Sequence, residues 1–172
     1  MSWVYDYRIF SYVISLGSTL AVFAAGIATL QFGHVDIDIS YTYARLGIAS
    51  AVLTFFPLLF ILLRECVNRP VDVKTELIIL PILSVFWLAA GGVTVVTRTN
   101  VFGHGPCDDF TDFTQNGLCA YAEPISTFSF VPAGLMLSYE LLLLLIGSCG
   151  ERREKPIWAH PVRGPAIREV GF

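Results

Sequence analysis

The residues best suited to chemistry by type and spacing are two cysteines, Cys107 and Cys119, which enclose the acidic stretch CDDFTDFTQNGLC. Closing a loop of this size with a disulfide stabilises a fold by about 3 kcal/mol in the chain-entropy model. A redox-active disulfide would need a second, closely spaced pair to pass electrons onward. The chain has no C-x-x-C, and its other cysteines, Cys66 and Cys149, lie far apart. We therefore expect a structural disulfide.

Glu140 is the one carboxylate that lies well inside a long apolar segment. An ionisable residue at membrane depth is by default a functional hypothesis that requires a partner. The candidate partners are Arg8, Arg64 and the hydroxyls of Tyr12 and Ser15. Two interpretations stay open, a glutamate that locks helix packing or docks a partner subunit, and a proton or cation relay. The first is favoured, because a relay needs a chain of polar groups and the apolar segments offer only scattered hydroxyls.

The three histidines, His34, His104 and His160, all lie outside the apolar segments. Membrane cytochromes hold haem through histidines within their helices, so we expect no haem and no other cofactor. Two histidines, His34 and His104, with no clear third ligand do not predict a metal site. The sequence contains no nucleophile–base set, phosphate loop or zinc-ligand spacing, so we expect no enzymatic activity. A basic patch with interleaved aromatic residues is also missing, which argues against nucleic acid as a partner.

The composition predicts a membrane protein. Of 172 residues, 55% are hydrophobic and 15% are charged, and the mean hydropathy is +0.66. Four apolar runs, about 9–32, 44–63, 76–97 and 124–147, are each long enough to cross a bilayer as a helix. We predict an all-α fold, a bundle of four transmembrane helices. Residues 1–8 would form an interfacial N-terminus, and residues 148–172 a cytosolic tail.

The distribution of basic residues predicts that both termini lie inside. With the N-terminus in the cytosol, nine of the eleven Lys and Arg residues are cytosolic, and only Arg45 and Arg98 are not. The same orientation puts Cys107 and Cys119 in the second outer loop, on the side where disulfides persist. Cys66 and Cys149 then lie inside, where thiols stay reduced. We expect a multi-pass protein of the plasma membrane or of a secretory-pathway membrane.

Small residues predict where helices approach one another or another protein, because they allow close backbone contact in a membrane. They recur at helical spacing in the first apolar segment and appear as isolated glycines in the third and fourth. The candidate packing residues are Gly17, Ala21, Ala25, Gly91, Gly92 and Gly134.

Two features beside the helix ends predict lipid contact. Cys66 and Cys149 lie within a few residues of a helix end, where cysteines are either S-acylation sites or simply free thiols. The cluster Arg152, Arg153 and Lys155 would either contact anionic lipids of the inner leaflet or only enforce the topology. The expected partners are therefore membrane lipids, a sterol or an anionic lipid, together with other membrane subunits or further copies of the chain.

The pattern as a whole resembles the MARVEL family, especially its small fungal members. The resemblance covers about residues 8–147, with two departures, Pro81 in the first half of the third segment and Glu140. It implies a role without catalysis in membrane apposition, lateral organisation or vesicle traffic. The features that carry it are Arg8, Ala44–Arg45, Glu76, VFWLAAGGVT (Val85–Thr94), the Cys107–Cys119 pair and Ala120–Tyr121–Ala122.

Two functions are thus expected from the sequence. The first is a non-catalytic membrane protein that organises membrane domains or protein assemblies through helix packing and lipid contacts. The alternative is an accessory subunit that stabilises a larger membrane enzyme or transporter. Glu140 favours the alternative, since a polar group at membrane depth is a ready docking point for a partner helix.

Overall fold

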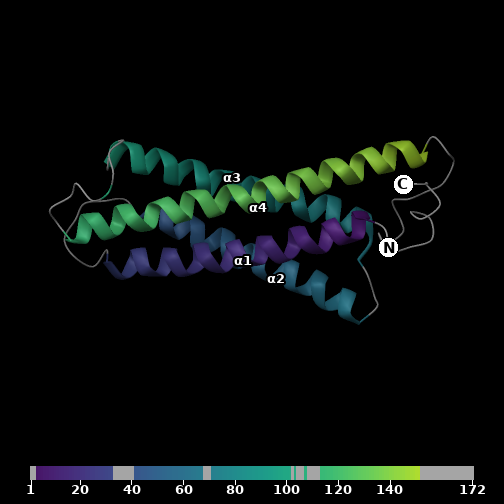
Figure 1. The fold of residues 1–172 in the computed structure, drawn as a ribbon, viewed down its shortest axis with the longest axis horizontal. Helices are drawn as coiled ribbons and strands as arrows, with labels where there is room; N and C mark the ends of the chain where they lie inside the picture. Colours follow the sequence, from purple (N-terminus) through teal and green to yellow (C-terminus); the bar gives the residue numbers. More distant parts are fainter. Residues whose placement is uncertain are drawn as a thin grey trace.

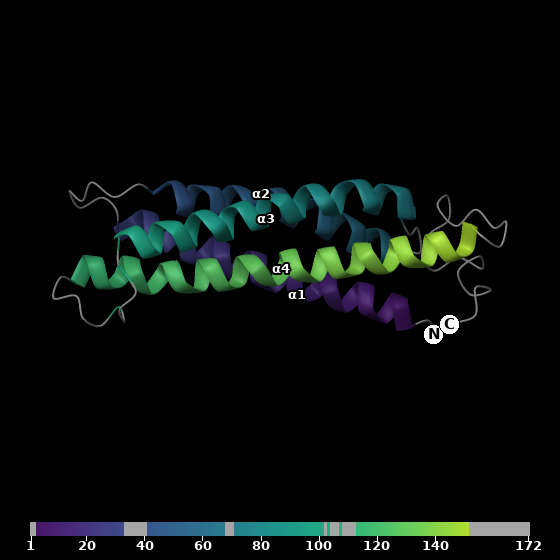
Figure 2. The ribbon, with the colours of Figure 1, turned by 90° about the horizontal axis from the view of Figure 1, so that it is seen from above.

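The fold consists of four long helices that run alternately up and down (Figures 1 and 2). In the computed structural model the described residues are 3–32, 41–67, 71–101, 103, 107 and 113–151. Helix α1 packs against α2 and α4, and α3 packs against the same two helices. The helices are α1 (Trp3–Phe32), α2 (Thr42–Cys66), α3 (Val73–Val101) and α4 (Phe113–Glu151).

The prediction of four spans is confirmed in its coarse form, because each helix contains a stretch long and apolar enough to cross a membrane. Large apolar side chains cover the outside of the bundle. Phe56, Ile78 and Val85 are each 65% exposed. A water-soluble bundle would place polar side chains there, so this surface is suited to lipid. The multi-pass character of the protein follows from the four apolar helices.

The helices extend beyond the apolar segments predicted from the sequence. Helix α1 already begins at Trp3, α2 continues to Cys66, and α3 begins at Val73. Hydropathy alone ends a span where charges begin, whereas some of the charged groups at these ends are buried within the bundle. Glu65 and Glu76 are 6% and 0% exposed. The connection between the second and third segments, which the sequence predicts over about residues 64–75, is therefore limited to the residues between Cys66 and Val73.

Close helix contacts depend on three glycines at two crossings, that of α1 with α2 and that of α3 with α4. A Cβ atom added to Gly26 of α1 would lie 2.7 Å from Cγ1 of Ile48 in α2. At Gly47 it would meet Val22 at 3.3 Å, and at Gly91 it would meet the ring of Phe130 in α4 at 3.0 Å. Such contacts are the close approach that small residues permit between membrane helices.

Trp87 lies fully buried in the middle of the bundle. Its indole N–H donates a hydrogen bond of 2.8 Å to the hydroxyl of Thr54, and so joins α3 to α2. Buried Trp side chains need such a partner, since an unpaired N–H in an apolar medium is costly.

The predicted disulfide between Cys107 and Cys119 is also present. It ties the segment before α4 to a buried position on that helix.

Candidate functional site

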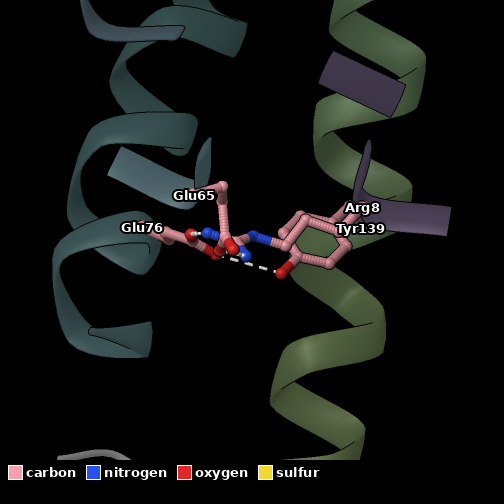
Figure 3. Close-up of polar contacts among 4 residues, drawn as sticks. All are labelled: Arg8, Glu65, Glu76 and Tyr139. Atoms are coloured by element: carbon pink, nitrogen blue, oxygen red, sulfur yellow. Dashed lines mark hydrogen bonds and ion pairs between the residues drawn. The ribbon is translucent and has the colours of Figure 1, made fainter. Parts of the chain in front are cut away.

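The most polar part of the bundle is a cluster of four residues, one from each helix, which we call the Arg8 cluster: Arg8, Glu65, Glu76 and Tyr139. The two terminal nitrogens of Arg8 each donate to a carboxylate, one to Glu65 of α2 and the other to Glu76 of α3 (Figure 3). The hydroxyl of Tyr139 in α4 donates to Oε2 of Glu76 at 3.0 Å. Arg8, Glu76 and Tyr139 are 0% exposed.

Aromatic side chains surround the Arg8 cluster. The ring of Tyr12 lies edge-on to that of Tyr139, with centroids 5.8 Å apart, and the guanidinium carbon of Arg8 lies 5.6 Å from the Tyr12 centroid. The Tyr7 ring lies 6.4 Å from that of Tyr139, and its hydroxyl is 2.6 Å from that of Ser138. The rings exclude solvent and place a favourable quadrupole beside the cation.

The helix ends explain why these residues meet. Glu65 is the penultimate residue of α2, Glu76 lies in the first turn of α3, and only six residues separate the two helices. An acidic group is favoured in the first turn of a helix and disfavoured in the last. Glu76 is therefore stabilised by its own helix, whereas Glu65 depends on the cation supplied by α1. Arg8 lies in the second turn of α1, level with both carboxylates.

The Arg8 cluster is arranged to hold helices together. Both terminal nitrogens of its only cation are bound to carboxylates of the same chain, so its charge is compensated within the bundle. Breaking a buried pair leaves an uncompensated charge, which costs about 3–5 kcal/mol. Among the described residues, no group of three or more His, Cys, Asp or Glu side chains is placed to hold a metal ion.

Glu140, the main candidate from the sequence, lies outside the Arg8 cluster. Its side chain is 8% exposed, and its Oε1 is buried with no hydrogen-bond partner among the described residues. Arg8, one of its expected partners, is bound to Glu65 and Glu76 instead. The reason is angular, since consecutive helical residues point about 100° apart and Tyr139 is the one that faces Arg8.

The six candidate packing residues divide into two sets. Gly91 lies against the ring of Phe130, and Ala25 is buried in the core. Ala21 is half-buried. An added Cβ atom at the remaining three would have no neighbour within 4 Å, so they make no close contact with the described residues: Gly17, Gly92 and Gly134.

The candidate lipid-contact residues are only partly described. Cys66 is an exposed free thiol at the end of α2. Arg152, Arg153 and Lys155 lie outside the described residues, as do the three histidines and the side chain of Cys149. Their predicted roles stay predictions.

The Arg8 cluster was not foreseen from the sequence, although a signal for it exists. Arg8, Glu65 and Glu76 were treated as markers of span ends, and Arg8 was counted as a cytosolic charge. One cation and two acids lie at the same end of three apolar helices, and such a set of charges is able to pair inside a bundle.

Comparison of the chain with protein-family models, curated proteins and solved structures finds no match to any of them.

Proposed function

We propose that this chain is a non-catalytic integral membrane protein that organises membrane domains or protein assemblies through helix packing and lipid contacts. The observation that carries the proposal is the Arg8 cluster, in which charges of three helices are paired with one another and a hydroxyl of the fourth joins them by a hydrogen bond. The polar groups at this end thus serve the bundle itself. The outer surface is apolar and suited to lipid and to other membrane helices.

The proposal includes an orientation, with both termini in the cytosol, in the plasma membrane or a secretory-pathway membrane. The asymmetry of basic residues supports it. Removing the buried Arg8 from the cytosolic count leaves eight basic residues against two, so the asymmetry persists. The disulfide supports it too, since such a bond persists on the non-cytosolic side. A MARVEL-like role in lateral organisation fits this arrangement.

Self-association would use the small-residue face of α1. Gly17 is exposed and has no neighbour within 4 Å, and the half-buried Ala21 lies one turn further on. This spacing lets two membrane helices approach closely. The face is left uncovered by α2 and α4, the two helices that pack on α1.

The test is Gly17→Leu in the full chain, with energy transfer between labelled copies in lipid vesicles as the readout. We expect a several-fold loss of association, because a leucine keeps the backbones apart, while the thermal stability of the bundle stays unchanged. Ala89→Leu is the matched control, since Ala89 is a small exposed residue of α3. Equal association of the unmodified chain, Gly17→Leu and Ala89→Leu would contradict this mode of organisation.

The second candidate function, an accessory subunit of a larger membrane complex, is favoured by Glu140. A buried carboxylate oxygen without a partner in the described chain is costly, and a donor on a partner helix would relieve that cost. Only the edge of the side chain is open to such a partner, since it is 8% exposed.

Two variants of Glu140 test this second function. Gln keeps the shape of Glu and its hydrogen-bonding capacity, whereas Leu removes all polar atoms. If Glu140 docks a partner, Glu140→Leu lowers recovery of the hetero-complex after gentle detergent extraction and sizing, and Glu140→Gln recovers it nearly in full. Equal recovery for both variants would remove this role.

A further inference from the structure

A groove between α1 and α2 lies at the same end of the bundle as the Arg8 cluster, where α2 diverges from α1 (Figure 1). Its volume is about 470 Å³. Asp6 is in the first turn of α1, and Cys66 is the last residue of α2, so the groove lies at headgroup level of a bilayer crossed by these helices. Its walls are formed by Tyr5, Asp6, Ile9, Leu62, Glu65 and Cys66.

The charge of this groove is negative. Two carboxylates, Asp6 and Glu65, line it, and none of its described lining residues is a Lys or Arg. Glu65 is 6% exposed, and while its Oε1 accepts from Arg8, its Oε2 has no hydrogen-bond partner among the described residues. Arg8 cannot balance the site, since its single positive charge is shared between Glu65 and Glu76. Within the described part of the chain, the two carboxylates of the groove thus have less positive charge beside them than negative, and Oε2 of Glu65 has room for a hydrogen-bond donor.

A second, wholly apolar groove lies deeper on the same α1–α2 seam, with a volume of about 220 Å³. Along α1 it begins at Thr19, about 15 Å beyond Ile9 at 1.5 Å per residue, which is half of the roughly 30 Å hydrocarbon core. That separation matches the length of one leaflet, from headgroup to the end of the acyl chain. The lining residues are Thr19, Leu20, Phe23, Ala51, Val52, Phe55 and Phe56.

From these two grooves we infer that the α1–α2 seam binds a phospholipid with a primary ammonium headgroup, of the phosphatidylethanolamine class. The ammonium donates hydrogen bonds to the carboxylates of Asp6 and Glu65, and one acyl chain follows the seam into the deeper apolar groove. A primary ammonium offers three N–H donors, as a lysine side chain does, whereas the trimethylated headgroup of phosphatidylcholine offers none. The site thereby distinguishes two lipids of the same net charge.

This inference deepens the proposed function, since it names the lipid class that the bundle would gather, and it rests on that proposal for residence in the membrane. It requires neither self-association nor a partner subunit. The Gly17→Leu variant should therefore retain the lipid preference even where it loses association. A failure of the lipid site and a failure of the organising role are thus distinguishable.

The experiment measures lipids retained by the purified full-length chain in native mass spectrometry. The lipids share acyl chains and differ only in headgroup: phosphatidylethanolamine, its mono- and dimethylated forms, and phosphatidylcholine. We expect retention to fall with each added methyl group, with about a tenfold preference for the first lipid over the last, the size of one hydrogen bond to a charged group. Equal retention across the series would overturn the inference.

Substitutions locate the preference. Asp6→Asn should abolish most of it, whereas Asp72→Asn should preserve it. Asp72 is an exposed acid at the same end of the bundle that does not line the groove. An unchanged preference in Asp6→Asn would contradict the inference. If Asp6→Asn instead releases only a co-purifying protein, the groove binds a basic residue of a partner and the lipid site is wrong.

The apolar groove has its own test. Val52→Phe should lower retention of every lipid in the series several-fold by filling the groove, and Val85→Phe, the same change at an exposed position of α3 outside the groove, should not. Glycerophosphoethanolamine, which has the headgroup but no acyl chains, should bind far more weakly than the lipid. Binding of equal strength would show that the acyl chain contributes nothing, and would overturn the assignment to a lipid.

Discussion

Arg8 is the residue on which the bundle depends most directly, because it is the only cation in a buried group with two carboxylates. Its guanidinium reaches α2 and α3 at once, and Tyr139 extends the same network to α4. Each carboxylate is compensated only while Arg8 is present. A neutral residue at position 8 would leave two buried acids close together without a counter-charge.

Arg8→Leu should therefore lower the stability of the bundle by about 3 kcal/mol or more, the cost of breaking a buried pair. The measurement is unfolding in mild detergent, monitored by the loss of the helical circular dichroism signal. A triple variant, Arg8→Leu with Glu65→Gln and Glu76→Gln, should recover part of the loss because no unpaired charge remains. The contribution of the Arg8 cluster is thus measured both by the stability that the single variant loses and by the stability that the triple variant regains.

The control for this prediction is the ion pair between Arg98 and Glu123. Its atoms are 3.6 Å apart, and its side chains are 32% and 61% exposed. Such pairs contribute at most about 1 kcal/mol, so Arg98→Gln should have a small effect. If Arg8→Leu were as mild as Arg98→Gln, the Arg8 cluster would not be what joins the four helices.

At the scale of the helix, the crossing of α1 and α2 depends on Gly26. Gly26→Ala would put a methyl group 2.7 Å from Ile48 Cγ1, so the helices or the isoleucine must move. We expect a loss of about 1–3 kcal/mol, as for other overpacked cores, in the same unfolding measurement. Ile48→Ala in the Gly26→Ala background should relieve the clash.

Gly92→Ala is the matched glycine control for Gly26→Ala. It adds the same methyl group where no neighbour lies within 4 Å. Alanine is favoured over glycine inside a helix by roughly 0.5–1 kcal/mol, so this variant should be neutral or slightly more stable. Two equal losses would mean that the cost lies in the helix itself, and the crossing would not be the cause.

The sequence was sufficient to predict the elements but not the Arg8 cluster. The length of an apolar run determines whether a helix can cross a bilayer, which is why the four helices were predicted correctly. The Cys107–Cys119 disulfide was also predicted correctly, from the positions of the cysteines in the sequence. Span ends are defined by charges, and hydropathy cannot distinguish a charge that enters water from one that meets a partner inside. Glu65 was therefore placed between the second and third segments, and Glu76 at the outermost position of the third, although both are buried in helices.

The small residues show a similar limit. Periodicity predicts that a glycine face can approach another helix, but it does not say which helix. Gly91 contacts Phe130 of the same chain, whereas an added Cβ atom at Gly17 or Gly134 would have no described neighbour within 4 Å. Gly26 and Gly47, which both lie at the close crossing of α1 with α2, were not selected, because the partner of each is evident only in three dimensions.

The whole molecule places its polar and apolar features in a consistent order. The Arg8 cluster and the α1–α2 groove lie at one end, where α1 begins and α2 ends, while the disulfide lies where α4 begins, at the other (Figures 1 and 2). An apolar surface separates the two ends. This order fits the proposed orientation, in which the Arg8 cluster lies toward the cytosol and the disulfide on the opposite side.

The most direct test of that arrangement is thiol labelling in intact cells with reagents that do not cross membranes. After mild reduction from outside, Cys107 and Cys119 should react with an impermeant maleimide, while Cys66 should react only once the cells are permeabilised. The predicted result follows from four crossings with the disulfide outside and the exposed Cys66 thiol inside. Labelling of Cys66 in intact cells, or of Cys107 and Cys119 only after permeabilisation, would contradict the account.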